Sequence, residues 1–220
     1  MTEFKLYPSI LSADFSQLEK QIQDAETCGA DGIHIDVMDG HFVPSITFGT
    51  PIIKAVRSLS CLPLDVHMMT MHPENHFSEF ALAGADSITV HYEACPALAD
   101  TLVELDKFDV MKCVAVNPST PIEKVFGILH TVDRILIMSV EPGAGGQSFI
   151  PKSLKKIQTL SKEIKSQGLS IPIQVDGGIN PDTTLAAVRS GANILVAGSA
   201  VFNDNFSVCD GISKMRNSSS

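Results

Sequence analysis

The 220-residue chain lacks the cysteine pattern of a disulfide-rich protein. Its five cysteines are odd in number and widely spaced, and no two form a C-x-x-C pair. A disulfide framework is therefore not expected, and a reducing compartment is the natural setting. The first residues lack a basic region followed by an apolar stretch, and no run of about 18 apolar residues could span a bilayer. These absences predict a soluble cytoplasmic protein without a signal peptide.

Positive charge is also scarce. The chain has 16 Lys and Arg against 25 Asp and Glu, for a formal net charge of -9. Such a surface repels nucleic acid and anionic membranes, so neither is an expected partner. The 44% hydrophobic content is ordinary for a globular protein that buries one large core. A small-molecule ligand is the expected partner, and an anionic one would need a locally favourable pocket.

Short runs rich in Val and Ile alternate along the chain with longer helix-period segments, which is typical of βαβ units and a parallel sheet. The motif G-x-G-x-x-G of a dinucleotide-binding sheet is absent after the first run. Even spacing and a count of eight runs favour a closed (β/α)8 TIM barrel of class α/β over an open sheet. No linker divides the chain, so residues 1–220 are expected to form a single catalytic domain with a frayed tail near 217–220. The eight predicted strands lie near 6–11, 32–38, 62–68, 86–91, 111–116, 133–139, 171–176 and 193–197.

Residues that typically begin or end helices lie between the predicted strands. Ser16 to Glu19 has the pattern of a capping box at a helix start. Pro73 and Pro181 stand where the first residue of a helix is expected. A glycine that ends a helix before a short turn recurs three times, at Gly29, Gly84 and Gly191.

Four potential metal ligands fall at or near predicted strand ends: His34, Asp36, His67 and Asp176. His34 and Asp36 are two residues apart, so on a strand their side chains point to the same side, into the barrel. A lone His-x-Asp pair is more often an ordinary polar strand end. Four such groups within hydrophobic strands are better explained as a set of two histidines and two carboxylates, suited to Zn²⁺ or to Fe²⁺, Mn²⁺ or Co²⁺.

Glycines cluster after the last three predicted strands, in 142–146, 177–178 and 198–199. Glycine lets backbone amides approach and surround an anion, and the loops after strands seven and eight are the usual phosphate site of such barrels. Taken singly, each cluster could be only a tight turn, but three clusters in succession favour a phosphate-binding site. No Lys or Arg accompanies them, so backbone groups are expected to hold the anion.

Methionines also gather at predicted strand ends, at Met38, Met68, Met69 and Met138. Packing in the core is the simpler explanation for them, although an apolar lining would also keep water from a reactive intermediate. His41 and His91 lie near strand ends and could face the site. Cys113 lies within a predicted strand and is interpreted as a packing residue.

Several segments together resemble the ribulose-phosphate 3-epimerase family. They span nearly the whole chain and are PSILSADF at 8–15, HIDVMDGHFVPSITFG at 34–49, DVHMM at 65–69, VEPGAGGQSFIP at 140–151, VDGGI at 175–179 and VAGSAVF at 196–202. Members of this family interconvert D-ribulose 5-phosphate and D-xylulose 5-phosphate in the pentose phosphate pathway. The resemblance thus implies an isomerase that acts on a phosphorylated ketopentose.

The resemblance also implies roles for individual residues. Asp36 and Asp176 would be the proton acceptor and donor, and one divalent metal ion per subunit, Zn²⁺ first among the candidates, would be bound by His34, Asp36, His67 and Asp176. The residues implied to contact substrate are Ser9, His67, Gly143, Ala144, Gly145, Gly146, Asp176, Gly177, Gly178, Gly198 and Ser199. Met38, Met69 and Met138 would line the intermediate. A homo-oligomer, dimer or hexamer, is expected from the family.

Inversion of a carbon next to a ketone explains why two carboxylates are needed. One group removes a proton to give an ene-diolate, and another returns a proton on the opposite face. A single base could serve one face only. A divalent cation supplies Lewis-acid stabilisation of the charge that develops between the two steps.

Two departures from the family pattern affect the pocket. The family usually has Phe where Ala144 stands and Asn where Ser45 stands. The smaller Ala144 leaves room for an extra carbon, so a hexulose-phosphate 3-epimerase acting on allulose 6-phosphate is the alternative. A metal-dependent decarboxylase would need a lysine beside the aspartates, but Lys112 lies at the wrong end of its strand. A phosphosugar-binding barrel without activity is a third hypothesis.

Overall fold

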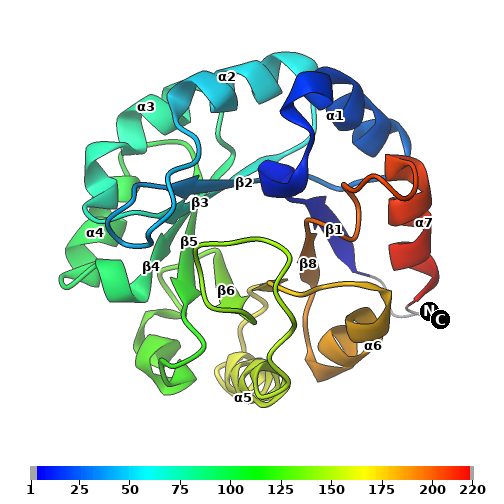
Figure 1. The fold of residues 1–220 in the computed structure, drawn as a ribbon. Helices are drawn as coiled ribbons and strands as arrows, with labels where there is room; N and C mark the ends of the chain where they lie inside the picture. The colour runs from blue at the N-terminus through cyan, green and yellow to red at the C-terminus, as the bar shows by residue number, and fades with distance from the viewer. Residues whose placement is uncertain (1–3, 219–220) are drawn as a thin grey trace.

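The computed structural model describes residues 4–218. Eight parallel strands form one sheet in the order β1-β8-β7-β6-β5-β4-β3-β2. The sheet curves into a nearly closed barrel with the helices outside it (Figure 1). An isolated parallel bridge between Ser9 and His34 joins the two ends of the sheet. The strands are β1 (Lys5–Pro8), β2 (Ile33–Met38), β3 (Leu64–Met69), β4 (Ser87–His91), β5 (Met111–Val116), β6 (Arg134–Met138), β7 (Ile173–Asp176) and β8 (Ile194–Ala197).

Helices connect most of the strands and confirm the predicted TIM barrel. They are α1 (Leu18–Thr27), α2 (Thr50–Leu59), α3 (Phe77–Leu82), α4 (Leu98–Leu105), α5 (Ser153–Ser166), α6 (Pro181–Ser190) and α7 (Val208–Asn217). Short 3-10 turns are η1 (Ile10–Ser12), η2 (Phe15–Gln17), η3 (Pro73–Asn75), η4 (Tyr92–Ala94) and η5 (Ile122–Ile128). The η5 turn takes the place of a helix between β5 and β6.

Alternate residues of each strand face opposite sides of the sheet, as the strand geometry requires. On β3, Leu64, Val66 and Met68 are buried in the main core. That core also contains residues of the surrounding helices, such as Phe77 and Phe80 of α3. The intervening residues of β3, Asp65 and His67, are buried among polar groups from other strands. The barrel therefore has an apolar outer shell and a partly polar interior.

The predicted first strand, 6–11, is too long. β1 ends at Pro8 because the Ser9 hydroxyl accepts a hydrogen bond from the Leu11 amide and caps the η1 turn. The predicted capping box at Ser16 is also wrong. Asp14 accepts the Ser16 amide and caps η2 instead, and α1 begins at Leu18 without a side-chain cap.

The other helix boundaries agree with the sequence more closely. Pro181 is the first residue of α6, which Asn180 caps, whereas Pro73 starts only the short η3 turn. Gly29, Gly84 and Gly191 all have the left-handed backbone expected after a helix. In the described residues 4–218, no helix is long and apolar enough to cross a membrane. The tail expected to fray near 217–220 is only partly covered, since α7 reaches Asn217 and residues 219–220 lie outside the described part.

One disulfide corrects the expectation drawn from the cysteine spacing. Cys28 at the end of α1 is bonded to Cys209 in α7, across a sequence separation of 181 residues and a Cα–Cα distance of 5.2 Å. α1 and α7 lie side by side in Figure 1, which explains how two distant cysteines meet. Cys61, Cys95 and Cys113 are free thiols.

Candidate active site and metal centre

Four side chains from three strands converge inside the barrel. They are His34 and Asp36 of β2, His67 of β3 and Asp176 of β7. One potential ligand atom from each lies within 4.8 Å of those of the others. The prediction that these residues meet is confirmed, and the short separation brings the carboxylates of Asp36 and Asp176 to one place.

The two imidazoles present different nitrogens to the carboxylates. His34 Nε2 lies 3.3 Å from Asp36 Oδ1 and 3.8 Å from Asp176 Oδ2. His67 instead uses Nδ1, which lies 3.0 Å from Asp36 Oδ1 and 3.7 Å from Asp176 Oδ2. The other Asp36 oxygen accepts a hydrogen bond of 2.6 Å from the Ser9 hydroxyl. Ser9, which directly follows β1, therefore orients the carboxylate.

A buried polar network holds His34 from behind. His34 Nδ1 lies 2.8 Å from Asp65 Oδ2, which also accepts a 2.6 Å hydrogen bond from Gln174. Asp65 forms an ion pair with Arg134, and Ser87 donates to the same carboxylate at 2.7 Å. Because Asp65 is an ionised acceptor, it favours the proton of His34 on Nδ1 and leaves the lone pair of Nε2 facing the cluster.

The two aspartates differ in proton affinity in this metal-free arrangement. Burial opposes ionisation of Asp36, but the adjacent imidazoles of His34 and His67 outweigh it and hold its pKa well below the usual range. Burial, followed by repulsion from Asp36, raises the pKa of Asp176 to about 7. Two carboxylates with separated proton affinities are the usual setting for an acid and a base.

These four residues fit a divalent metal ion. His34 Nε2 is fully buried and forms no hydrogen bond within residues 4–218, although it faces two carboxylates. A buried nitrogen without a partner is costly, and a cation would satisfy it. Two imidazole nitrogens with carboxylate oxygens suit Zn²⁺ and also Fe²⁺, Mn²⁺ or Co²⁺.

A cavity opens above the cluster at the carboxyl ends of the strands. Most of the residues predicted to contact substrate or intermediate line it: Ser9, Asp36, Met38, Met69, Met138, Gly143, Ala144, Gly145, Gly146, Asp176, Gly177, Gly178, Gly198 and Ser199. No Lys or Arg is among the described residues of this lining. An anion bound there would rely on backbone amides, as the glycine clusters suggested.

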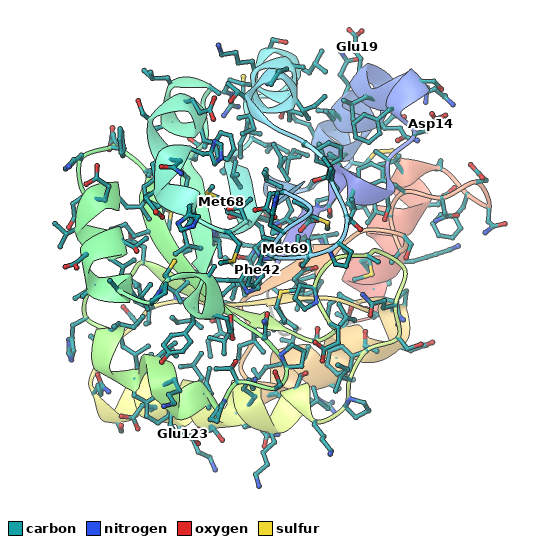
Figure 2. All side chains as sticks on the ribbon, turned by 60° about the vertical axis from the view of Figure 1, so that its left-hand side comes forward. Asp14, Glu19, Phe42, Met68, Met69 and Glu123 are labelled. Atoms are coloured by element: carbon teal, nitrogen blue, oxygen red, sulfur yellow. A yellow bond between two sulfur atoms is a disulfide. The ribbon has the colours of Figure 1, made fainter. Side chains whose placement is uncertain are left out.

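Three of the residues singled out in the sequence, His34, His67 and Met68, do not line this cavity. His34 and His67 are fully buried beneath Asp36 and are absent from the cavity lining, so the expected contact of His67 with substrate stays a prediction. Met68 faces the outer core, and its neighbour Met69 lines the cavity. Figure 2 shows Met69 near Phe42 at the centre of the molecule, and the two residues belong to one small apolar cluster.

Sequence reasoning missed the residues that support the site. Asp65 and Gln174 each stand two positions before a cluster residue, His67 or Asp176, so the alternation of a strand already places them on the inner side. Arg134 is the first residue of β6. Its burial, at 2% exposure, depends on Asp65 from a strand 69 residues away.

Comparison with known proteins identifies the family. The model of the "Ribulose-phosphate 3 epimerase family" matches residues 5–202. The ribulose-phosphate 3-epimerase of Bacillus subtilis is 47% identical over 202 residues, which cover 91% of this chain and 93% of that protein. The chain belongs to the ribulose-phosphate 3-epimerase family. The suspected resemblance is therefore confirmed, and the protein is an enzyme of the isomerase class.

A second epimerase agrees with this assignment, and a solved structure of another enzyme shares the fold. The ribulose-phosphate 3-epimerase of Synechocystis is 50% identical over 198 residues, covering 89% of this chain and 86% of that protein. A crystal structure of 3-hexulose-6-phosphate synthase superposes with a TM-score of 0.73 at 18% identity, covering 99% of this chain and 100% of the other. At that identity the likeness supports the barrel fold alone.

Proposed function

We propose that this member of the ribulose-phosphate 3-epimerase family inverts carbon 3 of D-ribulose 5-phosphate to give D-xylulose 5-phosphate. The observation that carries the proposal is the meeting of Asp36 and Asp176 beneath a cavity whose rim consists of glycine loops. A phosphate on the glycine amides and a sugar over the carboxylates would fill this cavity together. The reaction belongs to the pentose phosphate pathway.

In the proposed mechanism, the Asp36 carboxylate removes the proton from carbon 3 of ribulose 5-phosphate. Asp176 delivers a proton to the opposite face of the flat ene-diolate, and the roles exchange in the reverse direction. Met38, Met69 and Met138 line the cavity and exclude water from the intermediate. A divalent cation held by His34, Asp36, His67 and Asp176, one per subunit with Zn²⁺ first among the candidates, supplies Lewis-acid stabilisation of the developing negative charge.

The glycine loops hold the other end of the substrate in this proposal. Amides around Gly177, Gly178 and Gly198 bind the phosphate without a cationic side chain. Ser45 donates a 2.7 Å hydrogen bond to the Gly143 carbonyl and so fastens the loop after β6 to the loop after β2. Ala144 is exposed on the former loop, beside the cavity.

An isotope experiment separates a two-base mechanism from its alternatives. Each epimer is incubated in deuterium oxide with wild type, Asp176→Asn or Asp36→Asn, and deuterium at carbon 3 of the unreacted sugar is measured. We expect Asp176→Asn to lose inversion by about 10²–10⁴-fold. It should still exchange the carbon 3 proton of ribulose 5-phosphate through Asp36, but not that of xylulose 5-phosphate.

Asp36→Asn should show the opposite asymmetry, and Asp182→Asn, which changes an exposed carboxylate at the start of α6, should behave as wild type. Full inversion by Asp176→Asn, or equal exchange of both epimers by each variant, would remove the two aspartates from these roles. Loss of activity on chelation and its return with each metal in turn tests the cation. Specificity constants measured side by side for allulose 6-phosphate test the hexulose alternative that Ala144 raises.

We also propose that the enzyme acts in the cytoplasm as a homo-oligomer. The anionic surface and the absence of a membrane-spanning helix in residues 4–218 support a protein free of membranes. Sedimentation analysis would distinguish a dimer or hexamer from a monomer.

A further inference from the structure

A third buried histidine lies directly behind His67. His91 ends β4 and is fully buried, and its Nε2 is 2.8 Å from His67 Nε2. Its other ring nitrogen, Nδ1, is 3.2 Å from Glu93 Oε2 in the η4 turn. The His67 and His91 rings stack with centroids 5.0 Å apart, and Phe42, labelled in Figure 2, packs on the His91 ring at 4.7 Å.

Two ring nitrogens at 2.8 Å form a hydrogen bond only if one carries a proton and the other presents a lone pair. Two proton arrangements satisfy this condition. In one, His67 donates from Nε2 and keeps a lone pair on Nδ1, which faces the cluster. In the other, His91 donates from Nε2, so His67 carries its proton on Nδ1, where it would donate to Asp36 and exclude a cation.

Glu93 decides between the two arrangements. Full burial disfavours a charged imidazole, so His91 is neutral and has one proton. Glu93 is an acceptor, and its Oε1 takes a 2.8 Å hydrogen bond from the Asn117 amide. A carboxylate beside His91 Nδ1 attracts the His91 proton to that nitrogen. His91 Nε2 must then accept from His67 Nε2, and the lone pair of His67 Nδ1 is directed at the cation site.

We infer that Glu93 and His91 are positioning residues that act in series to keep the Nδ1 lone pair of His67 available to the metal ion. This inference rests on the proposed metal centre. His34 has a comparable arrangement with the nitrogens exchanged, because Asp65 holds its Nδ1 and leaves Nε2 for the cluster. Each of the two imidazoles thus has a carboxylate acceptor on the side away from the site, Asp65 directly for His34 and Glu93 through His91 for His67.

The sharpest test is Glu93→Gln, which keeps the size and polarity of the side chain but adds a donor. The new amide can donate to His91 Nδ1 while its oxygen still accepts from Asn117. His91 then carries its proton on Nε2 and donates to His67, whose proton moves to Nδ1. The change reverses the direction of both hydrogen bonds without removing either partner.

Two measurements detect whether the two hydrogen bonds of His91 are reversed. In the metal-free protein, nitrogen NMR shifts of the imidazoles should place the His67 proton on Nε2 in wild type and on Nδ1 in Glu93→Gln. Competition with a chelator should show that Glu93→Gln binds divalent metal about 10–100-fold more weakly. The matched control is Glu79→Gln, because Glu79 lies 2.6 Å from His76 Nδ1 in an exposed pair at the start of α3. It should leave metal affinity unchanged.

Variants of His91 test whether an acceptor for the His67 proton restores metal affinity. His91→Phe keeps a ring against Phe42 but cannot accept from His67, so it should lose metal affinity to a similar extent. His91→Gln offers an acceptor to His67 and a donor to Glu93, so it should recover much of that affinity. Wild-type affinity and an unchanged His67 tautomer in both Glu93→Gln and His91→Phe would overturn the inference. If wild type itself bound no divalent metal, the proposed metal centre would fail, and the tautomer measurement would still judge the relay.

Discussion

Gly178 offers a test of how tightly the glycine loops, which we propose to bind phosphate, are built. Its φ is +63°, a left-handed backbone that residues with a Cβ adopt at a cost. A Cβ at this position would also lie 2.3 Å from the backbone nitrogen of Phe149 and 2.6 Å from its Cα. Phe149 is part of the loop between β6 and α5, so Gly178→Ala must push apart two loops near the cavity.

The expected magnitude follows from those two effects. Left-handed backbone costs an alanine about 1–2 kcal/mol. Overpacking against backbone, which cannot swing away as a side-chain tip can, adds about 1–3 kcal/mol. Gly178→Ala should therefore lower the free energy of unfolding by about 2–5 kcal/mol. Loss of one amide hydrogen bond to a phosphate should weaken substrate binding by about 1.5–3 kcal/mol, or roughly 10- to 150-fold.

Gly168→Ala isolates the steric effect. Gly168 has a similar φ of +69°, but nothing lies within 4 Å of a Cβ built there. This control should lose only about 1–2 kcal/mol and keep wild-type kinetics. Denaturant unfolding measures stability, and steady-state kinetics with inorganic phosphate as competitor measures the binding site. Equal stability of the two variants would refute the packing argument, and an unchanged KM for Gly178→Ala would separate this loop from the phosphate.

Two further predictions concern contacts that are distant in sequence. Ser45→Ala removes the hydrogen bond to the Gly143 carbonyl and should raise KM about 2- to 10-fold with little change in kcat. The reason is that one neutral hydrogen bond contributes about 0.5–1.5 kcal/mol. An unchanged KM in steady-state assays would contradict this prediction. For the Cys28–Cys209 disulfide, thiol titration in denaturant should find three free thiols before reduction and all five cysteines after it. Reduction should lower the free energy of unfolding by up to about 5 kcal/mol, since the bond closes a loop of 181 residues. Equal denaturation midpoints for the oxidised and reduced protein would count against that figure.

Local patterns were sufficient to predict most of the strands and the cluster of candidate metal ligands. Runs such as Ile194–Ala197 are fully buried and apolar throughout, which is typical of strands of a parallel sheet. Within the similarly buried run Ile33–Met38, His34 and Asp36 stand out because polar groups are rare there, and their spacing of two puts them on one side. The eight-fold count then places the carboxyl ends of the strands around one mouth.

Features that depend on tertiary pairing could not be predicted in this way. Nothing near Cys28 indicates that α7 packs on α1 and brings Cys209 to it. The capping pattern at Ser16 competes with Asp14, and the structure shows that the carboxylate two residues earlier takes the amide. His91 was recognised only as a residue near a strand end, because its role depends on the positions of His67 and Glu93.

The ion pair between Asp65 and Arg134 links stability to the chemistry of the site. A buried ion pair adds little net stability compared with apolar residues of the same volume, whereas removal of one partner costs about 3–5 kcal/mol. Packing alone therefore does not explain why a barrel with an apolar outer shell has charges in its interior. The hydrogen bond that Asp65 accepts from His34 does explain it, because an ionised acceptor at that depth is needed to orient the imidazole. Arg134 keeps Asp65 ionised: burial opposes the charge, but the guanidinium and His34 outweigh it and lower the pKa of Asp65. Arg134 thus stabilises the charge of Asp65, and Asp65 orients His34. The polar residues inside the barrel therefore support the site above them.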